Sequence, residues 1–312
     1  MSGEIAPSEA ELGALATPWV SATSYWIPNH IVDSAWLEHA AFSAWLMSEL
    51  RPASVVELGT HHGFSYFAFC DFAQRLRLPT RLTAIDTWEG DEHAGFYGED
   101  VFTAVTALNQ QYEAQSTLVR SRFDEARGDV ADGSVDLLHI DGRHRYEDVV
   151  EDFELYLPSM SNRGVVMLHD IAEHRDDFGV YRFWEEIKQR FPTFEFFHEH
   201  GLGVVLVGAE TAPALLTLTE ANDVTKNAVR SAYARIGRRT RDVRHLVVRA
   251  AYAAELELHV AEDLRLIEKL KTEAFWVAEN VANLTAQQTA YESSKSWRLT
   301  APLRRVTNLF RR

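Results

Sequence analysis

The chain has 312 residues, of which 46% are hydrophobic and 25% charged, with a formal net charge of −15. This composition is typical of a folded globular protein with a sizeable core. The excess of acidic residues argues against nucleic acid as a partner of the whole chain. The single cysteine, Cys70, excludes an internal disulfide and a cysteine-based zinc cluster.

The first residues, Met1 to Ile5, lack the basic and apolar segments of a secretory signal. No stretch of the sequence is long and apolar enough to span a bilayer. A lone thiol within an apolar run fits a reducing compartment. These features predict a cytoplasmic protein.

Predicted elements in the first two-thirds of the chain alternate between helices and strands. A helix is expected over 33–50, where apolar residues recur at helical spacing, with Asp33 or Ser34 as its cap. Short apolar runs typical of strands follow at 54–58, 81–85, 116–119, 135–140 and 165–168, with a helix at 145–157 before the last of them. This alternation predicts a doubly wound α/β fold with a mostly parallel sheet covered on both faces.

Two further strands are expected at 194–198 and 203–207, which makes a seven-stranded sheet. They have no helix between them, so we expect an antiparallel hairpin at the edge of the sheet. The segment His198–Gly203 contains two histidines and a glutamate, which are residue types of metal sites, but its glycines favour the turn of this hairpin.

The pattern turns helical after about residue 210, which predicts one domain over 1–209 and a helical region over 210–312. Residues 253–291 fit a heptad whose a and d positions are apolar apart from Asp263 and Gln288. This repeat predicts a coiled coil, and hence a homo-oligomer. The alternative is a long helix that lies on the first domain.

A glycine-containing turn follows the first strand in the segment Glu57-Leu-Gly59-Thr60-His-His-Gly63. Glycines allow the backbone to approach a ligand, and the helix that follows offers free N–H groups at its start. His61 occupies the position of the middle glycine in the dinucleotide-binding pattern, which argues against a nicotinamide cofactor.

Asp86 ends the second strand and is followed by Thr87 and Trp88. A carboxylate at this position accepts hydrogen bonds from the hydroxyls of a bound ribose. The alternative is that Asp86 caps a helix. After the third strand, Asp124 is placed to meet a nucleobase, although a solvated loop carboxylate is an equal alternative.

Acidic residues also end the fourth and fifth strands, at Asp141 and Asp170. Because ligands of open α/β sheets bind outside the carboxyl ends of the strands, both carboxylates are expected at one edge, with His144 and His169 near them. His144 is the candidate general base, since imidazole titrates near neutral pH. His139 and His169 have the alternative of being packed and hydrogen-bonded within their strands, which we prefer for His139.

The segments Glu57-Leu-Gly59, Ile85-Asp86-Thr-Trp-Glu-Gly90, Leu138-His-Ile-Asp141-Gly-Arg-His144-Arg-Tyr146 and Leu168-His169-Asp170 together resemble class I S-adenosylmethionine-dependent methyltransferases. They are most similar to the sugar O-methyltransferases of macrolide and surface-polysaccharide pathways. This resemblance covers roughly residues 30–208. It implies Glu57 and Gly59 at the methionine end of the cofactor, Asp86 on its ribose and Asp124 near its adenine.

Thr60, Gly63, Thr87, Trp88 and Asp141 complete the predicted cofactor site. Asp141, His144 and His169 are the predicted catalytic residues, with a sugar or glycan as the methyl acceptor.

Several antibiotic-pathway relatives depend on a metal held by acids at these strand ends. Asp141 and Asp170 are therefore the candidate ligands of a Mg²⁺ ion that would bind two sugar hydroxyls. In this chain His169 stands where some relatives have a second acid, and Arg143 follows the first one. Both changes reduce the negative charge that a hard cation needs.

The loop from Trp88 to Asp100 combines aromatic residues, glycines and acids, which suits recognition of the acceptor. At the other end of the chain, Ser294-Lys-Ser-Trp297-Arg-Leu-Thr-Ala-Pro-Leu-Arg304 resembles a segment that ends coiled coils in bacterial polysaccharide-assembly proteins. From Lys295 to Arg312 there are six basic residues and no acidic ones. The tail is thus expected to contact an anionic membrane surface or a glycosyltransferase, unless it is a loose solvated terminus.

The sequence leaves three functions open. The first is a sugar O-methyltransferase of surface-polysaccharide or glycolipid assembly. The second is a non-catalytic methyltransferase-like scaffold carried on a coiled coil. The third, which His61 disfavours, is a nicotinamide-dependent oxidoreductase.

Overall fold

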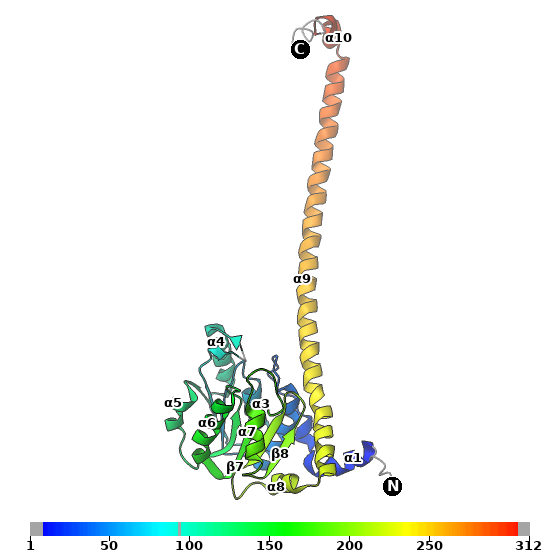
Figure 1. The fold of residues 1–312 in the computed structure, drawn as a ribbon. Helices are drawn as coiled ribbons and strands as arrows, with labels where there is room; N and C mark the ends of the chain where they lie inside the picture. Colours follow the sequence, from blue (N-terminus) through cyan, green and yellow to red (C-terminus); the bar gives the residue numbers. More distant parts are fainter. Residues whose placement is uncertain (1–8, 93–94, 305–312) are drawn as a thin grey trace. The chain divides into compact units, whose positions relative to one another are not determined.

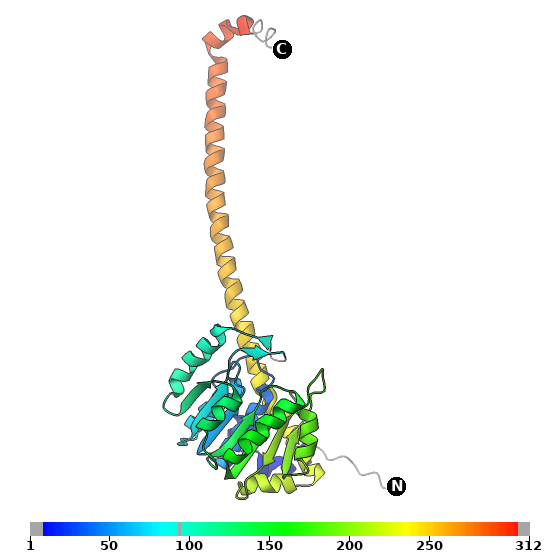
Figure 2. The same cartoon turned by 60° about the vertical axis from the view of Figure 1, so that its left-hand side comes forward.

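The computed structural model describes residues 9–92 and 95–304, and its centre is a seven-stranded sheet (Figures 1 and 2). Across the sheet the strands are β5 (Ser116–Arg120), β2 (Arg81–Asp86), β1 (Ser54–Leu58), β6 (Val135–Ile140), β7 (Met160–His169), β9 (Leu202–Leu206) and β8 (Thr193–Phe196). The first five are parallel, and β9 runs antiparallel to both of its neighbours. The predicted fold class, the strands and the edge hairpin are confirmed.

The order of the strands reverses direction between β1 and β6. From β1 the chain moves outward through β2 to β5 and then returns to β6 on the other side of β1. In an open α/β sheet such a switch point opens a crevice at the carboxyl ends of the strands. The loops that follow β1, β2, β5, β6 and β7 therefore converge on one edge.

Alternation along the strands divides the core between the two faces of the sheet. Val55, Leu137 and Val165 pack with α2 (Ala40–Leu50) and α3 (Phe64–Arg75). Their neighbours Val56, Leu138 and Val166 pack with α6 (Tyr146–Tyr156) and α7 (Val180–Ile187) on the opposite face. Both faces are apolar because helices cover both, as a parallel sheet requires.

The remaining elements are short or lie at the margins of the sheet. They are α1 (Glu9–Ala16), the two-residue strands β3 (Gly90–Asp91) and β4 (Gly95–Phe96), α4 (Glu99–Asn109), α5 (Phe123–Ala126), α8 (Pro213–Glu220) and α10 (Lys295–Leu299). Short 3₁₀ turns occupy 17–19, 22–25, 37–39, 110–112, 127–129 and 157–159. Among the helices of the described residues, none is both long and apolar enough to cross a membrane.

Two predicted elements differ from the structure by more than two residues at their starts. The helix expected from residue 33 begins as a 3₁₀ turn at Leu37, because the Ser34 hydroxyl accepts a hydrogen bond from the Trp36 N–H and closes a turn before it. It ends as expected, with Arg51 in the left-handed conformation. Strand β7 starts at Met160, five residues before the predicted start, where Met160 pairs with Val135 across a register shift.

A single helix, α9, spans Asp223–Ser293, so the helical character expected after residue 210 is confirmed. Its first part is buried, and the Tyr233 hydroxyl donates a hydrogen bond to the Trp19 carbonyl at 2.5 Å. Contacts within the chain separate one compact unit, up to Leu246, from a second that starts at Val247. The predicted domain limits, 1–209 and 210–312, stay a prediction, but residues beyond 209 clearly contribute to the core of the sheet unit.

The backbone of α9 packs closely on this core at Gly237. A Cβ atom at Gly237 would lie 2.1 Å from the carbonyl oxygen of Glu38. In an exposed helix, Gly→Ala stabilises a protein by about 1 kcal/mol. We expect Gly237→Ala to lower the free energy of unfolding instead, by about 1–3 kcal/mol, because the backbones must separate. Chemical denaturation measures this, with the exposed Arg235→Ala as control; a stabilised Gly237→Ala variant would contradict the packing.

Candidate functional site

The turn after β1 packs directly against the loop after β6 because Gly59 has no side chain. Gly59 has φ +86°, and a Cβ atom there would lie 2.0 Å from the carbonyl oxygen of Asp141. Gly63, with φ +80°, leads into α3. Both glycines thus adopt backbone conformations that other residues rarely adopt, which explains their place in the turn.

Asp86 ties this turn to the end of β2. One carboxylate oxygen accepts hydrogen bonds from the N–H groups of Thr60 and His61, at 2.7 and 2.9 Å, and the other accepts one from Trp88 N–H at 2.7 Å. No helix starts at Asp86, since the chain turns there and continues into β3. The helix-cap alternative for Asp86 is therefore wrong.

Two cavities open at this edge of the sheet. Cavity A has a volume of about 350 Å³ and extends from the turn after β1 toward α5 and α6. Its walls contain Gly59, His61, Asp86, Thr87, Glu89, Gly90, Asp91, Tyr97, Arg122, Phe123, Asp124, Asp141, Gly142, Arg143, His144, Asp148, Glu151, Asp152 and Leu155.

Cavity B, of about 420 Å³, lies on the other side of the same turn. Its walls contain Val32, Asp33, Ser34, Ala35, Gly59, Thr60, His61, His62, Phe64, Ser65, Asp141, His144, His169 and Asp170. Gly59, His61, Asp141 and His144 line both cavities. The candidate base therefore stands where the two cavities meet.

Three predicted cofactor residues lie away from both walls. Trp88 is buried, with its indole N–H donating to the His61 carbonyl and its ring 4.9 Å from that of Phe102. Gly63 lies within the helix start, close to the Phe67 ring. Glu57 is fully buried. Glu57, Gly63 and Trp88 thus pack around the turn after β1, and none of the three lines either cavity.

Glu57 forms a buried pair with His139. The imidazole Nδ1 lies 2.7 Å from the Glu57 carboxylate, and neither side chain is exposed. Burial raises the pKa of Glu57, although the contact with His139 opposes it. His139 is thus a packed, hydrogen-bonded histidine, as expected from its place in β6.

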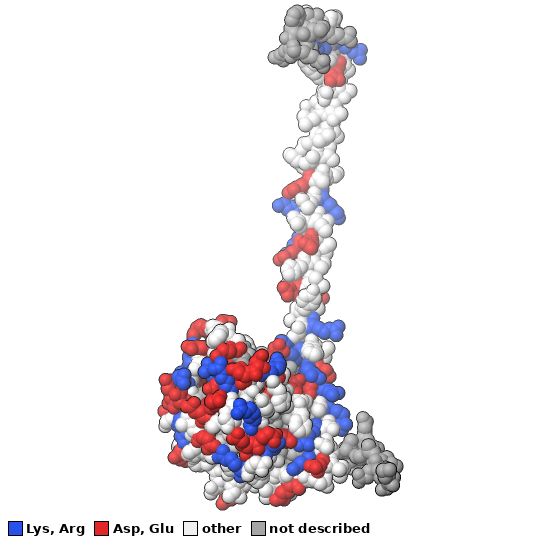
Figure 3. All heavy atoms as spheres, viewed as in Figure 1, with Lys and Arg blue, Asp and Glu red and all other residues white. Residues whose placement is uncertain are grey.

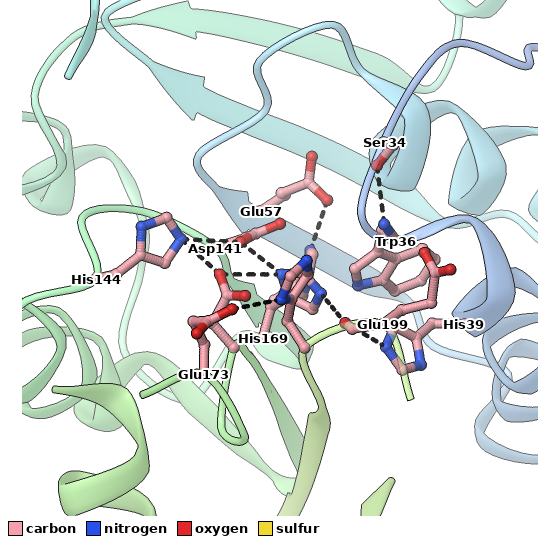
Figure 4. Close-up of polar contacts among 12 residues, drawn as sticks. Ser34, Trp36, His39, Glu57, Asp141, His144, His169, Glu173 and Glu199 are labelled. Carbon is pink, nitrogen blue, oxygen red and sulfur yellow. Dashed lines mark hydrogen bonds and ion pairs between the residues drawn. The ribbon is translucent and has the colours of Figure 1, made fainter. Parts of the chain in front are cut away.

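The strand-end residues Asp141 and Asp170 do come together, and two imidazoles lie against them (Figure 4). His144 Nε2 lies 2.7 Å from the Asp170 carboxylate and 3.7 Å from that of Asp141. His169 Nδ1 lies 3.1 Å from Asp141 and 3.3 Å from Asp170. Figure 4 shows His144 and His169 both directed toward Asp141. Each carboxylate thus contacts both histidines.

The second nitrogen of His169 is also engaged. Its Nε2 lies 3.1 Å from the Glu199 carbonyl oxygen, which also contacts His39 Nε2 at 3.3 Å. A carbonyl oxygen only accepts hydrogen bonds, so Nε2 of His169 carries a proton. Glu199 lies in the turn between β8 and β9, so the turn predicted at 198–203 is confirmed and also orients His169. His169 is packed and hydrogen-bonded within β7, in agreement with the alternative considered for it.

The electrostatics of the cluster follow from these contacts. Burial alone would lower the pKa of His144, but hydrogen bonds and charge from Asp141 and Asp170 raise it to about 9. The same carboxylates outweigh burial at His169 and raise its pKa well above the ordinary value. In return the imidazoles hold the pKa values of Asp141 and Asp170 low, against the effect of burial. The cluster pairs two carboxylates with two imidazoliums at neutral pH.

Asp141, His144 and Asp170 each offer one ligand atom, and these atoms lie within 4.8 Å of one another. The set contains an imidazole nitrogen, and a second imidazole, His169, already contacts both carboxylates. Mg²⁺ prefers oxygen ligands with near-octahedral geometry, which this arrangement does not offer. The residues present do not fit the expected Mg²⁺ site, and we derive no step through that ion.

The loop after β2 lies over cavity A. Glu89, Gly90, Asp91 and Tyr97 line it, and the Tyr97 ring packs at 4.9 Å from that of His61. This loop was expected to recognise the acceptor, yet its contacts are with cavity A and not with cavity B. His93, part of the same segment, lies outside the described residues.

Asp124 lines cavity A as expected but is half exposed, and its carboxylate is paired with Arg122 at 3.0 Å. Asp152, which we did not single out from the sequence, is buried in the wall of the same cavity. The signal for it was an acid on the inward face of the helix 145–157, four residues after Asp148. Such an acid within an apolar helix face indicates either a buried partner or a ligand.

The contact between His144 and Asp170 can be tested without any substrate. In an NMR titration we expect the His144 ring to titrate near pH 9. Asp170→Asn removes one negative charge, so it should lower that pKa by about one to two units. Asp132→Asn, which removes an acid paired with Arg127, is the control and should leave it unchanged. An unaltered His144 pKa in Asp170→Asn would show that the contact does not form.

Comparison with known proteins relates part of this chain to methyltransferases. Residues 56–171 match the model of a family described as a methyltransferase domain. This segment runs from β1 to just past Asp170, so it contains Asp86, Asp141 and His144. Over 191 residues, or 61% of the chain, the sequence is 50% identical to an uncharacterized protein, y4gI, of Sinorhizobium fredii. The chain covers 21% of the length of that protein.

Solved structures with a similar arrangement include the O-methyltransferase TomG of Streptomyces achromogenes in complex with SAM. It is 16% identical, with a TM-score of 0.42, over 66% of this chain and 93% of that one. The SAH-bound methyltransferase PaMTH1 of Podospora anserina is 12% identical, with a TM-score of 0.42, over 65% and 98% of the two chains. Similarity at this level does not transfer a substrate. By its sheet and its matched segment, the chain has a Rossmann-like methyltransferase fold with a methyltransferase-domain match at residues 56–171.

Proposed function

We propose that this protein is an S-adenosylmethionine-dependent O-methyltransferase that acts on a sugar hydroxyl in surface-polysaccharide or glycolipid assembly. One observation carries the proposal: His144, held by Asp141 and Asp170, lies at the junction of two cavities. A methyl transfer needs a donor and an acceptor side by side, with a base at the acceptor oxygen.

Cavity A fits the nucleoside part of the cofactor. Asp86 and Thr87 line it at the end of β2, where a ribose is recognised in this class of sheet. Gly59 and Gly142 bring backbone to its wall, where a Cβ atom would meet Asp141 or the Phe123 ring. In the turn after β1, Thr60 Oγ1 is buried without a hydrogen-bond partner among the described residues, and Thr60 lines cavity B. A polar ligand group such as the methionine end of the cofactor would satisfy that hydroxyl.

S-adenosylmethionine supplies an electrophilic methyl group on a sulfonium when bound. His144 takes the proton of the acceptor hydroxyl as negative charge develops on the oxygen. Asp141 and Asp170 fix the direction of the His144 ring, and His169 is a positioning residue that holds both carboxylates. Because only the neutral imidazole accepts a proton, the rate is expected to rise with pH as His144 deprotonates, toward about 9 in the free enzyme.

Cavity B fits a hydroxyl-rich acceptor. Its wall combines polar groups, among them Asp33, Ser34 and His62, with apolar surface from residues such as Val32 and Phe64. Such groups exchange hydrogen bonds with sugar hydroxyls, whereas a flat aromatic acceptor needs apolar walls. The polar groups of the wall are those that would bind the hydroxyls of a sugar.

The function is tested first by binding and then by transfer. Wild-type protein should bind S-adenosylhomocysteine in calorimetry and should transfer tritiated methyl groups to polysaccharide precursors. We expect His144→Ala to lower the rate constant by about 10²–10⁴-fold while it retains affinity for the product cofactor. The assay is run after treatment with EDTA, and added Mg²⁺ should leave the rate unchanged. Absence of S-adenosylhomocysteine binding would reject the proposal.

The two other functions give different results. Titration with a nicotinamide cofactor would saturate an oxidoreductase and should show no binding here. A scaffold would keep its role in cells without chemistry, so full complementation of a deletion by the double variant Asp141→Asn, His144→Ala would favour it.

We further propose that α9 forms a coiled coil with a second copy of the chain. The apolar a and d side chains of the heptad over 253–291 are about half exposed along the described helix, as Leu256, Val260, Ile267, Leu270, Val277, Val281 and Leu284 show. On the face seen in Figure 3, the distal part of α9 carries few charged side chains. A second copy offers the same stripe at the same spacing, and a dimer is the commonest closed assembly.

Light scattering after size exclusion tests this assembly. We expect the wild-type chain to be a dimer and Leu270→Asp with Val277→Asp to be a monomer, because charge at a d position is buried against the partner. Leu258, at an f position, is equally apolar and 69% exposed, so Leu258→Asp is the matched control and should remain dimeric. A monomeric wild-type chain would overturn the proposal.

Beyond the coiled coil, Ser294 caps α10 by accepting a hydrogen bond from Trp297 N–H, and the Arg304 guanidinium lies 3.3 Å from the centroid of the Trp297 ring. The basic residues Arg305, Arg311 and Arg312 lie outside the described residues. Contact of this tail with a membrane surface or a glycosyltransferase, and a cytoplasmic location, stay predictions.

A further inference from the structure

Asp152 is a buried acid that faces cavity A without a partner. Its exposed fraction is 9%, it lines the cavity, and its carboxyl group forms no hydrogen bond with any described residue. One turn earlier on α6, Asp148 also lines the cavity, and its Oδ2 atom is buried without a hydrogen-bond partner among the described residues. Buried polar groups are almost always hydrogen-bonded, so an unpartnered pair in a cavity wall indicates a ligand.

The walls around Asp152 are shaped for a flat ring. Gly142 leaves the wall open, since a Cβ atom there would lie 2.5 Å from the Phe123 ring and 3.4 Å from Asp152 Oδ2. Phe123 and Leu155 supply apolar surface, and the Tyr156 hydroxyl fixes Phe123 by donating to its carbonyl at 2.8 Å. A planar base can thus pack against apolar groups while its polar edge meets the Asp152 carboxyl group.

Asp124 is less suited to this role. Its carboxylate is half exposed and is already paired with Arg122. An exposed, paired carboxylate discriminates weakly, because water competes for its hydrogen bonds. Asp152 is buried and has no competing partner among the described residues.

We propose that Asp152, and not Asp124, recognises the adenine base of the cofactor, and that it does so as a neutral carboxylic acid. Its O–H donates to a ring nitrogen of adenine, and its carbonyl oxygen accepts a hydrogen bond from the exocyclic amino group. This assignment rests on the proposed function, because it requires that cavity A hold S-adenosylmethionine.

The charges around Asp152 favour the neutral form. Asp148 and Glu151 face it from α6 and Asp124 from α5, while Gly142, at the end of β6, brings no charge. The nearby guanidiniums are engaged elsewhere, that of Arg122 with Asp124 and that of Arg127 with Asp132 and the carbonyls of Val130 and Leu155. Burial, and then repulsion from these carboxylates, raises the pKa of Asp152 to about 7.

A pH dependence of cofactor affinity follows. If only the neutral acid binds adenine, the competent fraction falls as the pH rises through about 7, and the apparent Kd rises by the inverse of that fraction. Asp152→Asn keeps a donor and an acceptor at every pH, so its affinity should lack this dependence. The ratio of wild-type to variant Kd cancels titration of the ligand and of other groups in the cavity, such as His144.

Calorimetry with S-adenosylhomocysteine on the full chain provides the measurement. At about pH 6 we expect the Kd values of wild type and Asp152→Asn to be similar, and at about pH 8.5 that of wild type to be roughly tenfold or more higher. Asp124→Asn should keep a pH dependence like that of wild type, displaced to lower pH because one of the carboxylates that raise the pKa of Asp152 is removed. Asn has the shape of the protonated acid, so the substitution at 152 should not impair folding.

Each outcome is decisive. A ratio that stays constant with pH, or wild-type binding that tightens as the pH rises, would overturn the neutral-acid assignment while the proposed function stands. Loss of binding in Asp124→Asn, with no effect in Asp152→Asn, would return adenine recognition to Asp124. Failure of the wild type to bind S-adenosylhomocysteine at either pH would instead reject the proposed function itself.

Discussion

The arrangement of this site depends on two carboxylates that the sheet forces together. Asp141 and Asp170 follow adjacent parallel strands, so their side chains must meet at the same edge, where Asp170 is buried and Asp141 is partly exposed. Two such charges are tolerated only with compensation. His144 and His169 supply it, and the hydrogen bond from His169 to the Glu199 carbonyl fixes the second histidine in place. The orientation of the candidate base therefore follows from the need to neutralise the strand ends.

The identity of residue 169 then determines the chemistry that this edge can support. An acid at that position would leave three carboxylates that require a cation. Histidine brings the positive charge within the chain and occupies the space between Asp141 and Asp170. The two carboxylates also raise the pKa of His144 to about 9, which keeps it protonated at neutral pH. Arrival of a positively charged sulfonium beside it would lower that pKa, so cofactor binding and base activation are coupled by simple electrostatics.

Sequence reasoning succeeded where hydrophobic periodicity and sheet topology determine the structure. Alternation of strands and helices predicts the sheet, and the sheet alone brings Asp141 and Asp170 together. It did not succeed where tertiary packing determines which way a side chain faces. Whether Trp88 faces a ligand or the core depends on its left-handed backbone, and whether Asp152 faces a cavity depends on how α6 is rotated against β6. Neither the backbone angle nor the helix rotation is encoded in a local sequence pattern. Trp88, which was predicted at the cofactor, therefore lies in the core, and Asp152, which was not predicted, lies in the cavity wall.

The packing of the start of α9 on the core is another feature that the sequence pattern does not predict. Its heptad could be identified from sequence, but the close contact of Gly237 with Glu38 could not. Arg241, one turn later, pairs with both Glu38 and Glu199, and Glu199 provides the carbonyl that holds His169. One helix thus contributes to the core, supports the turn that contacts His169 and continues into the predicted coiled coil. Because Arg241 contacts both Glu38 and Glu199, the site and the base of α9 are connected parts of the molecule.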